Sequence, residues 1–216
     1  TVSGTQLREL LQSGRPIPPE ITRPEIAEIL RRHVKAPEAP RKGVLLWFTG
    51  LSGAGKSTLA RAVEKRLSHH HVEVLDGDEI RTTLSKGLGF SKDDRDTNIR
   101  RIGLVGRLLA RNGVLAIGAA ISPYAETRNE VRAHAAAEGV AFVEVHLHAP
   151  MDSLVARDTK GLYKKALAGE LKHFTGVDDP YEAPVTPELS LDTSSMNVDA
   201  CTAKIIEVLA RFGVVA

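Results

Sequence analysis

The sequence predicts an α/β fold in which helices cover both faces of a parallel five-stranded sheet. Two observations predict this class. Short apolar runs alternate with stretches of helical periodicity from residue 43 onward, and such alternation is typical of parallel sheets with both faces buried. The first apolar run also leads through a glycine-rich segment into a helical pattern, which places a tight turn at the end of a buried strand.

The expected strands are five apolar runs, of which the last is the weakest. They span residues 44–49, 72–75, 114–121, 140–147 and 189–191. Helical patterns lie over residues 56–67, 94–111, 126–137 and 200–212. Residues 157–187 fit no strand and are rich in Lys, Gly and Pro, which predicts a long basic lid or functional loop.

The first forty residues differ from the rest of the chain. Ser3 is a candidate cap for a short helix through Leu11, and a second short helix is expected over residues 24–30. The polar, proline-spaced residues 36–43 are typical of a linker. We therefore expect a helical extension over residues 1–40 and a main domain over residues 41–216.

Composition limits the classes of partner. A formal net charge of +2 and an aromatic content of 4% argue against a nucleic-acid-binding surface. The sequence shows neither a signal-peptide core nor a run of about 18 apolar residues, and the single cysteine, Cys201, excludes an internal disulfide. The expected location is the cytoplasm, with neither nucleic acid nor a membrane as a partner.

The glycine-rich segment is the strongest functional signal. Residues 50–57, GLSGAGKS, match the P-loop pattern between a strand and a helix. Backbone N–H groups of such a loop bind phosphate oxygens, Lys56 reaches the β- and γ-phosphates as a candidate catalytic residue, and Ser57 ligates Mg²⁺. The expected ATP-binding residues are Gly50, Leu51, Ser52, Gly53, Ala54, Gly55, Lys56, Ser57 and Thr58. The motif by itself does not name the reaction.

Two carboxylates, Asp76 and Asp78, follow the second expected strand. The carboxyl ends of strands in a doubly wound sheet line the ligand crevice, so this pair is suited to holding Mg²⁺ and accepting a proton from an attacking hydroxyl. A turn that caps the next helix is an equally good interpretation, because Asp favours both positions. A guanine-specific Asn-Lys-x-Asp motif is absent from the sequence, which argues against a signalling GTPase.

Five further motifs follow the P-loop. They are LDGDEIR (75–81), GLGFSKDDRDTNIRRIG (87–103), ISPY (121–124), DTKGLYKKA (158–166) and FTGVDDPYE (174–182). Together with the P-loop, they give residues 43–195 a resemblance to adenylyl-sulfate kinase. The resemblance implies a P-loop kinase fold, usually a homodimer, that uses ATP and Mg²⁺ to phosphorylate the 3′-hydroxyl of adenosine 5′-phosphosulfate.

The resemblance also implies roles for matching positions. Asp76 would organise Mg²⁺ and act on the acceptor hydroxyl, with Asp78 in support and Lys160 closing over the transferring phosphate. The implied metal ligands are Ser57 and Asp76. The implied substrate-binding residues are Arg81, Phe90, Arg95, Asn98, Ile121, Ser122, Lys160, Gly161, Leu162 and Phe174.

Within this set, Arg81, Arg95 and Asn98 would grip the phosphosulfate, whose anionic oxygens suit converging guanidinium donors. Phe90 and Phe174 would sandwich the adenine, since both lie in glycine-containing loops that are poor places for core residues. Simpler alternatives stay open. The three polar residues also read as solvated helix positions, and the two phenylalanines as caps on small loop clusters.

Ser122 stands at the serine that this family has sometimes assigned as a phosphoenzyme intermediate. Direct in-line transfer needs no covalent intermediate, and ISPY supplies no neighbouring base, so we expect Ser122 to bind substrate instead. Two positions depart from the common family pattern. Ala125 stands where many relatives carry a basic residue and Thr159 where proline is common, and we expect both to tune affinity.

Residues 2–30 resemble the C-terminal end of an ATP sulfurylase domain, the enzyme that makes adenosine 5′-phosphosulfate. The resemblance implies a longer fusion with a sulfurylase domain in cis, and the alternative is an unrelated helical arm. Two other functions stay open for the main domain. One is a P-loop kinase for a different small molecule, such as a nucleoside or sugar acid, and the other is a nucleotide-binding module without turnover.

Overall fold

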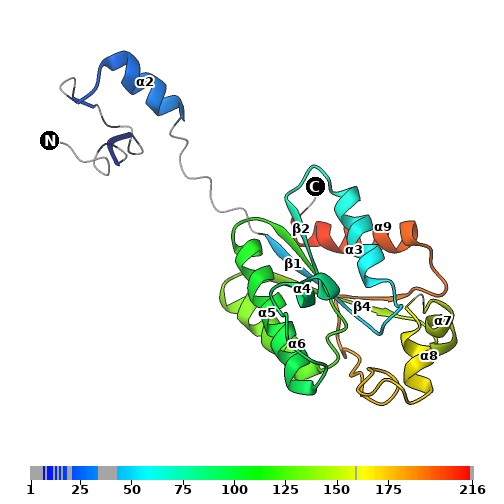
Figure 1. Ribbon diagram of the computed structural model, residues 1–216. Helices are drawn as coiled ribbons and strands as arrows, with labels where there is room; N and C mark the ends of the chain where they lie inside the picture. Colours follow the sequence, from blue (N-terminus) through cyan, green and yellow to red (C-terminus); the bar gives the residue numbers. More distant parts are fainter. Residues whose placement is uncertain are drawn as a thin grey trace. The chain divides into compact units, whose positions relative to one another are not determined.

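The computed structural model describes residues 7, 9–11, 13, 15, 17, 18, 21–33, 43–158 and 160–214. Contacts between residues divide the chain into two compact units, Thr1–Arg41 and Lys42–Ala216. In the first unit, the described residues 7 and 9–11 are helical and α2 spans Pro24–His33 (Figure 1). The expected helix start at Ser3 and most of the expected linker lie outside the described residues.

One parallel sheet forms the centre of the second unit. Its strands are β1 (Val44–Thr49), β2 (Val72–Asp76), β3 (Leu115–Ala119), β4 (Ala141–His148) and β5 (Leu189–Asp192). They lie in the order β2-β3-β1-β4-β5, and each neighbouring pair is parallel. The predicted five-stranded parallel sheet is therefore confirmed. Both β1 and β3 are buried along their whole length, which explains why they read as continuous apolar runs.

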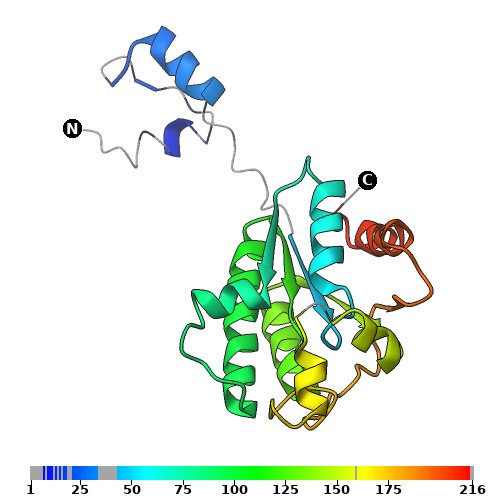
Figure 2. The same cartoon turned by 45° about the vertical axis from the view of Figure 1, so that its right-hand side comes forward.

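Helices cover both faces of this sheet. On one face α3 (Lys56–Arg66) packs beside α9 (Val198–Arg211), and on the other α5 (Lys92–Arg111) packs beside α6 (Ala125–Ala137). The two pairs lie on opposite sides of the strands in Figures 1 and 2. All four helices were predicted, with ends that differ by one or two residues.

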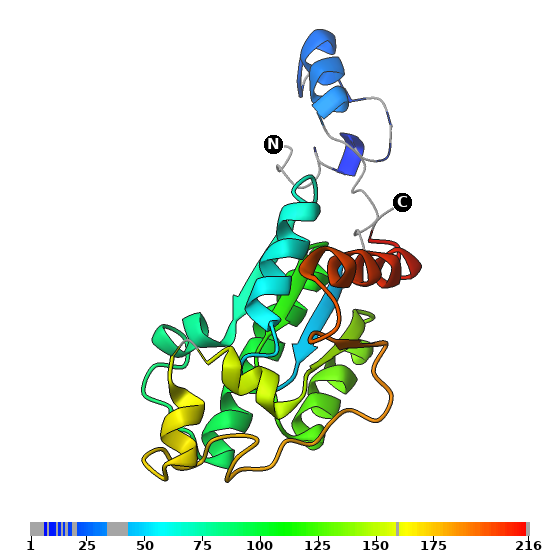
Figure 3. The ribbon, with the colours of Figure 1, turned by 90° about the vertical axis from the view of Figure 1, so that its right-hand side faces the viewer.

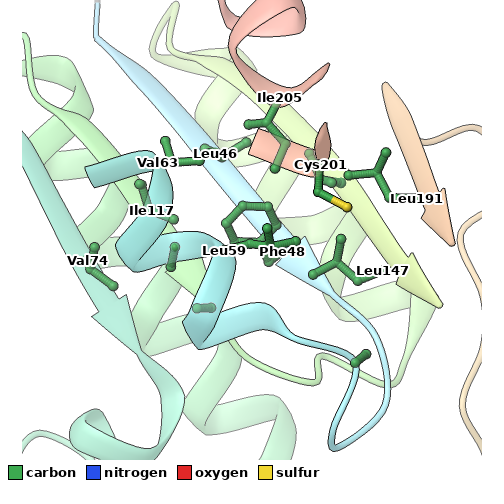
Figure 4. Close-up of a cluster of buried hydrophobic side chains, with 14 of the residues drawn as sticks. Leu46, Phe48, Leu59, Val63, Val74, Ile117, Leu147, Leu191, Cys201 and Ile205 are labelled. Atoms are coloured by element: carbon green, nitrogen blue, oxygen red, sulfur yellow. The ribbon is translucent and has the colours of Figure 1, made fainter. Parts of the chain in front are cut away.

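The side chains of β1 alternate between the two faces. Leu46 and Phe48 pack under α3 and α9, together with Ile205 and the buried Cys201 (Figure 4). Trp47 points to the other face, toward α5 and α6. This period of two is what a strand buried on both faces requires.

Trp47 needs space that its neighbouring strand provides. Gly118 of β3 lies beside it, and a Cβ atom at residue 118 would be 2.6 Å from the indole Cε3. The Trp47 ring stacks on Phe142 of β4 with 5.9 Å between ring centroids. A glycine is therefore required at residue 118 for Trp47 to lie flat in this layer.

Three short helices at the carboxyl end of the sheet were not predicted. They are α4 (Gly77–Thr82), α7 (Met151–Ala156) and α8 (Leu162–Leu167) (Figure 3). The lid, residues 157–187, was expected as a loop, and this was wrong for α8. The carboxylate of Asp158 accepts hydrogen bonds from three backbone N–H groups at the start of α8, so the helix depends on a cap outside its own periodicity.

None of the helices in the described part of the chain combines the length and the apolar character needed to cross a bilayer.

Candidate active site

A cavity of about 730 Å³ opens at the carboxyl end of the sheet. Its wall is built by the P-loop, the turn after β2, the start of α5, the loop after β3, the lid and the loop between β5 and α9. The predicted site residues on this wall are Ser52, Gly53, Gly55, Lys56, Ser57, Thr58, Asp76, Asp78, Arg81, Phe90, Arg95, Asn98, Ile121, Ser122 and Lys160. The fold therefore brings most of the predicted site into one space.

The P-loop adopts a conformation that only glycine allows at two points. Gly50 has φ +146° and lies so close to β4 that a Cβ atom would be 2.2 Å from the Leu147 carbonyl oxygen. Gly55 has φ +92° and forms the N-cap of α3. Three residues of the predicted segment, Gly50, Leu51 and Ala54, are not on the wall, and Ala54 is fully buried in the core.

Lys56 lies against its own loop. Its Nζ donates hydrogen bonds to the carbonyl oxygens of Gly50 (2.9 Å) and Leu51 (2.8 Å). Burial lowers the pKa of Lys56 from 10.5 to about 8, although the nearby carboxylates of Asp78 and Asp76 act in the opposite direction. The ammonium group is thus held beside the phosphate-binding amides and is charged at neutral pH.

The capping interpretation of the acidic pair is confirmed, and the metal-binding interpretation stays a prediction. Asp76 is the N-cap of α4, and its Oδ1 accepts a hydrogen bond of 2.9 Å from the backbone N–H of Asp78. Both side chains also line the cavity. Lys160 reaches across from the lid, with its Nζ 2.6 Å from Asp78 Oδ2, and this contact raises the pKa of Lys160.

The oxygen atoms on the wall fit a magnesium ion that arrives with a nucleotide. Ser57 and Asp76 both line the cavity. Among the residues that the structure describes, no three His, Cys, Asp or Glu side chains are placed to hold a metal ion. Mg²⁺ usually keeps several waters and takes one or two protein oxygens plus substrate phosphates, so one carboxylate and one hydroxyl suffice.

Arg81 and Phe90 form one side of the cavity. The Arg81 guanidinium lies over the Phe90 ring, 4.6 Å from its centroid, and Nη1 donates to the Gly89 carbonyl (2.9 Å). The Phe90 side chain is 56% exposed, an unusual position for phenylalanine. The contact keeps a flat apolar ring and a cation together on the cavity wall.

Arg95 and Asn98 are buried on α5, so the solvated alternative was wrong for both. Arg95 ties α5 to the lid. Its Nε donates to Phe90 O (2.9 Å), Nη1 to Thr175 Oγ1 (2.7 Å) and Nη2 to His173 O. Asn98 is 3% exposed and lines the cavity, and its Oδ1 has no hydrogen-bond partner within the described chain. A buried acceptor of this kind is costly unless a ligand satisfies it.

Phe174 does not lie on the cavity wall. It is 8% exposed and packs in the core, edge-on to Tyr163 with 4.9 Å between ring centroids. The expectation that residue 174 is a poor place for a core side chain was therefore wrong, and no sandwich with Phe90 is formed. Gly161 and Leu162 are also absent from the wall, because Gly161 begins α8 with φ +66° and Leu162 packs against the core.

The hydroxyl of Ser122 is engaged by the protein. It accepts a hydrogen bond from Trp47 Nε1 (3.1 Å) and donates to the Ala120 carbonyl (3.3 Å), so neither partner is a base. Of the two departures from the family pattern, Ala125 begins α6 and donates its backbone N–H to Glu182 Oε2 (2.6 Å). Thr159 lies outside the described residues.

The lid contacts the P-loop. The Tyr163 hydroxyl on α8 donates to the Ser52 carbonyl at 3.0 Å. Burial raises the pKa of Tyr163 to about 12, so the hydroxyl keeps its proton and remains a donor. Arg157, at the start of the lid, donates to the Thr193 carbonyl after β5 at 2.7 Å. The first residues of the lid are therefore hydrogen-bonded to both neighbouring loops, through Arg157 before α8 and through Tyr163 on α8.

Comparison with known proteins identifies the family. The adenylylsulphate kinase family model matches residues 42–192. The chain belongs to this family. An adenylyl-sulfate kinase from Myxococcus xanthus is 59% identical over 172 residues, which cover 79% of this chain and 93% of that protein. The structure of the Mycobacterium tuberculosis APS kinase in complex with AMPPNP and APS matches with a TM-score of 0.76 and 44% identity, over 79% of this chain and 99% of that chain.

The N-terminal residues match a second family. The ATP-sulfurylase family model matches residues 1–33. The hexameric APS kinase from Thiobacillus denitrificans matches 100% of this chain with 37% identity and a TM-score of 0.63, and the match covers 38% of that longer chain.

One part of the cavity wall was not predicted from the sequence. This part includes Arg157 at the start of the lid, three residues between β5 and α9, and two on the first turn of α9: Thr193, Met196, Asn197, Val198 and Cys201. Most of these residues lie beyond residue 192, where the family match ends. Their position after the last strand was the available signal, because all carboxyl ends of a doubly wound sheet face the same crevice.

Proposed function

We propose that this protein transfers the γ-phosphoryl group of ATP to the 3′-hydroxyl of adenosine 5′-phosphosulfate, giving ADP and 3′-phosphoadenosine 5′-phosphosulfate. One observation carries the proposal: the P-loop and the wall formed by Arg81, Phe90 and Asn98 share a single cavity of about 730 Å³. A kinase must hold donor and acceptor together in a near-attack arrangement, and this cavity has a distinct surface for each.

The P-loop side suits the triphosphate of ATP. Backbone N–H groups of the loop and the N-terminal end of α3 face the phosphates. Lys56 exchanges its contacts with the loop carbonyls for the β- and γ-phosphates. Ser57 and Asp76 would hold Mg²⁺, which would neutralise phosphate charge.

The opposite side suits the acceptor. Phe90 offers a largely exposed ring on which an adenine stacks, and Arg81 and Arg95 add positive charge beside the phosphosulfate. The unpaired Oδ1 of Asn98 accepts a hydrogen bond from an N–H or O–H group of the acceptor. A ligand that lacks such a donor leaves this atom unsatisfied, which disfavours its binding.

The transfer is direct. Asp76 accepts the proton of the 3′-hydroxyl while that oxygen bonds to the γ-phosphorus, and the bond from this phosphorus to the β-phosphate oxygen breaks to release ADP. Lys160 stabilises the developing charge from the lid, and Asp78 holds it there. Ser122 forms no covalent intermediate, since its hydroxyl bonds to Trp47 and Ala120.

Acceptor-dependent formation of ADP is the decisive measurement. The full chain is mixed with MgATP and adenosine 5′-phosphosulfate, and ADP is measured along with the mass of the nucleotide product. We expect ADP well above the ATPase background and a product heavier by one phosphate. Adenosine and gluconate serve as competing acceptors that lack the phosphosulfate, and Lys56→Ala should lower the rate about 100-fold or more. Equal rates with gluconate, or nucleotide binding without turnover, would exclude the proposal.

The proposed domain arrangement and oligomeric state rest on the N-terminal residues and the relatives. We propose that residues 1–40 are the end of an ATP sulfurylase domain in cis, with the kinase domain over residues 41–216, and that the protein is a homo-oligomer. The match of residues 1–33 to the sulfurylase family and the longer hexameric relative support this. Light scattering on the full chain should give a mass at least twice that of the monomer. A monomer at micromolar concentration would contradict it.

A further inference from the structure

Arg128 on α6 is a buried cation that joins three separate parts of the chain. Its side chain is 2% exposed. Nε donates to Glu144 Oε1 on β4 (2.8 Å), Nη1 to the Ser122 carbonyl (2.7 Å) and Nη2 to the Glu182 carbonyl in the lid (2.6 Å). All three guanidinium nitrogens are engaged, and Arg128 is not part of the cavity wall. Any effect on the reaction is therefore indirect.

The first contact fixes a residue on the cavity wall. Ser122 has φ +50°, a left-handed conformation that is uncommon for residues other than glycine and needs support from its surroundings. Arg128 holds its carbonyl and Trp47 holds its hydroxyl. The Thr49 hydroxyl lies 3.4 Å from the same carbonyl oxygen, so Arg128 makes the shorter of the two contacts that present the Ser122 backbone to the acceptor.

The second contact fixes the end of the lid. Glu182 is fastened to the same loop in two further ways: its N–H donates to the Pro123 carbonyl (2.8 Å), and its Oε2 accepts from the Ala125 N–H (2.6 Å). Arg128 therefore connects two segments that are also hydrogen-bonded to each other: the loop after β3 and the end of the lid. A shift of either segment moves the other.

We propose that Arg128 is a positioning residue for the acceptor. It fixes Ser122 on the cavity wall and the end of the lid relative to each other, so that the acceptor hydroxyl meets the γ-phosphate. This inference rests on the proposed function. The hydrogen bonds of Arg128 go to Glu144, Ser122 and Glu182 and none reaches residues 50–58, so ATP binding in the absence of acceptor should not depend on Arg128.

A purely structural role is the competing explanation, and Arg132 provides the control. Arg132 also contacts the buried Glu144, from 3.1 Å, but its other nitrogen pairs with Glu188 at 2.6 Å, and it makes no contact with Ser122. Removing either arginine leaves the Glu144 carboxylate with one partner fewer, which is destabilising in a buried site. Placing both substitutions in a Glu144→Gln background removes that common effect.

The test compares Arg128→Gln with Arg132→Gln, each combined with Glu144→Gln. We expect the KM for adenosine 5′-phosphosulfate to be about 10-fold or more higher in the Arg128 variant, as for the loss of one charge-assisted hydrogen bond. The Kd for ADP should agree within about twofold between the two variants. Equal acceptor KM values, or a parallel loss of ADP affinity, would overturn the inference.

A second readout needs no turnover. The chain has one tryptophan, so Trp47 gives a single indole N–H signal in NMR spectra. Its hydrogen exchange should be faster in the Arg128 variant than in the Arg132 variant, because Ser122 no longer holds the indole N–H. Equal exchange rates in the two variants would contradict the role of Arg128. This readout does not require kinase activity, whereas a lack of activity in the unchanged protein would contradict the proposed function.

Discussion

Lys160 Nζ lies 2.6 Å from Asp78 Oδ2, so the lid reaches the turn after β2 through one ion pair. Both side chains are largely exposed, and such a pair adds little to stability. The pair instead holds an ammonium group on the cavity wall, beside Asp78.

Replacing Lys160 by Gln should therefore affect chemistry more than folding. We expect kcat to fall about 100-fold, as for the loss of one donor to developing charge, with little change in the melting temperature. Lys164→Gln is the matched control, because it removes an exposed lid lysine on α8 that has no side-chain contact with Asp78. Equal rates for the two variants would remove Lys160 from the catalytic set.

Alanine substitutions of Phe90 and Phe174 should have different effects, the first on acceptor binding and the second on the stability of the fold. Phe90→Ala should raise the KM for the acceptor, since stacking on an aromatic side chain contributes about 1–3 kcal/mol, and should leave the melting temperature nearly unchanged. Phe174→Ala should lower the free energy of unfolding by about 3–5 kcal/mol, because the residue is in the core. Steady-state kinetics measure the first effect and thermal melting the second. A Phe174 variant with normal stability but weak acceptor binding would support the adenine sandwich of Phe90 and Phe174.

Ser122→Ala should retain kinase activity. Its hydroxyl bonds to Trp47 and Ala120 rather than to a base, so we expect kcat within about 10-fold of the unchanged protein and a stability loss of about 1 kcal/mol from the lost hydrogen bond. Acid-quenched mass spectrometry after incubation with MgATP alone should detect no phosphoserine. A phosphorylated Ser122 that is consumed on addition of acceptor would contradict direct transfer.

The ionisation of Lys56 should be visible in the pH dependence of kcat/KM for ATP. Its pKa is lowered to about 8, so the ammonium form dominates below pH 8 and is lost as the pH rises through this value. Since kcat/KM for ATP reports ionisations of the free enzyme, it should decrease above about pH 8. Asp78→Asn removes a carboxylate that raises the pKa of Lys56, and should move the decrease to lower pH. A profile that is flat to pH 10 would contradict this assignment.

The four long helices were predictable because their apolar residues recur with helical periodicity, and the strands because they are continuous apolar runs. In β1 every residue is buried, and the matching run of apolar residues has the right length. The short helices lacked this signal: α4 and α8 depend on the capping carboxylates of Asp76 and Asp158, which read equally well as turn residues.

The site was predictable where a motif ties chemistry to backbone shape, as in the P-loop. It was less predictable where tertiary packing decides. Nothing local in the sequence distinguishes the exposed Phe90 from the buried Phe174, since each has a glycine within two residues. Likewise, Arg95 and Asn98 are polar residues on a helix, and their burial is set by the tertiary structure, as the contacts of Arg95 with the lid residues His173 and Thr175 show.

The hydrogen bond from Tyr163 to the Ser52 carbonyl has a consequence for engineering. One peptide group of the phosphate-binding loop serves as the docking point of α8, so the loop's geometry is shared between two tasks. Attempts to retarget the enzyme to other nucleotides by reshaping residues 51–53 would also misplace the segment that carries Lys160. Changes in donor preference are better sought after β5 at Met196 and Val198, which line the same cavity and take no part in the contact between Tyr163 and Ser52.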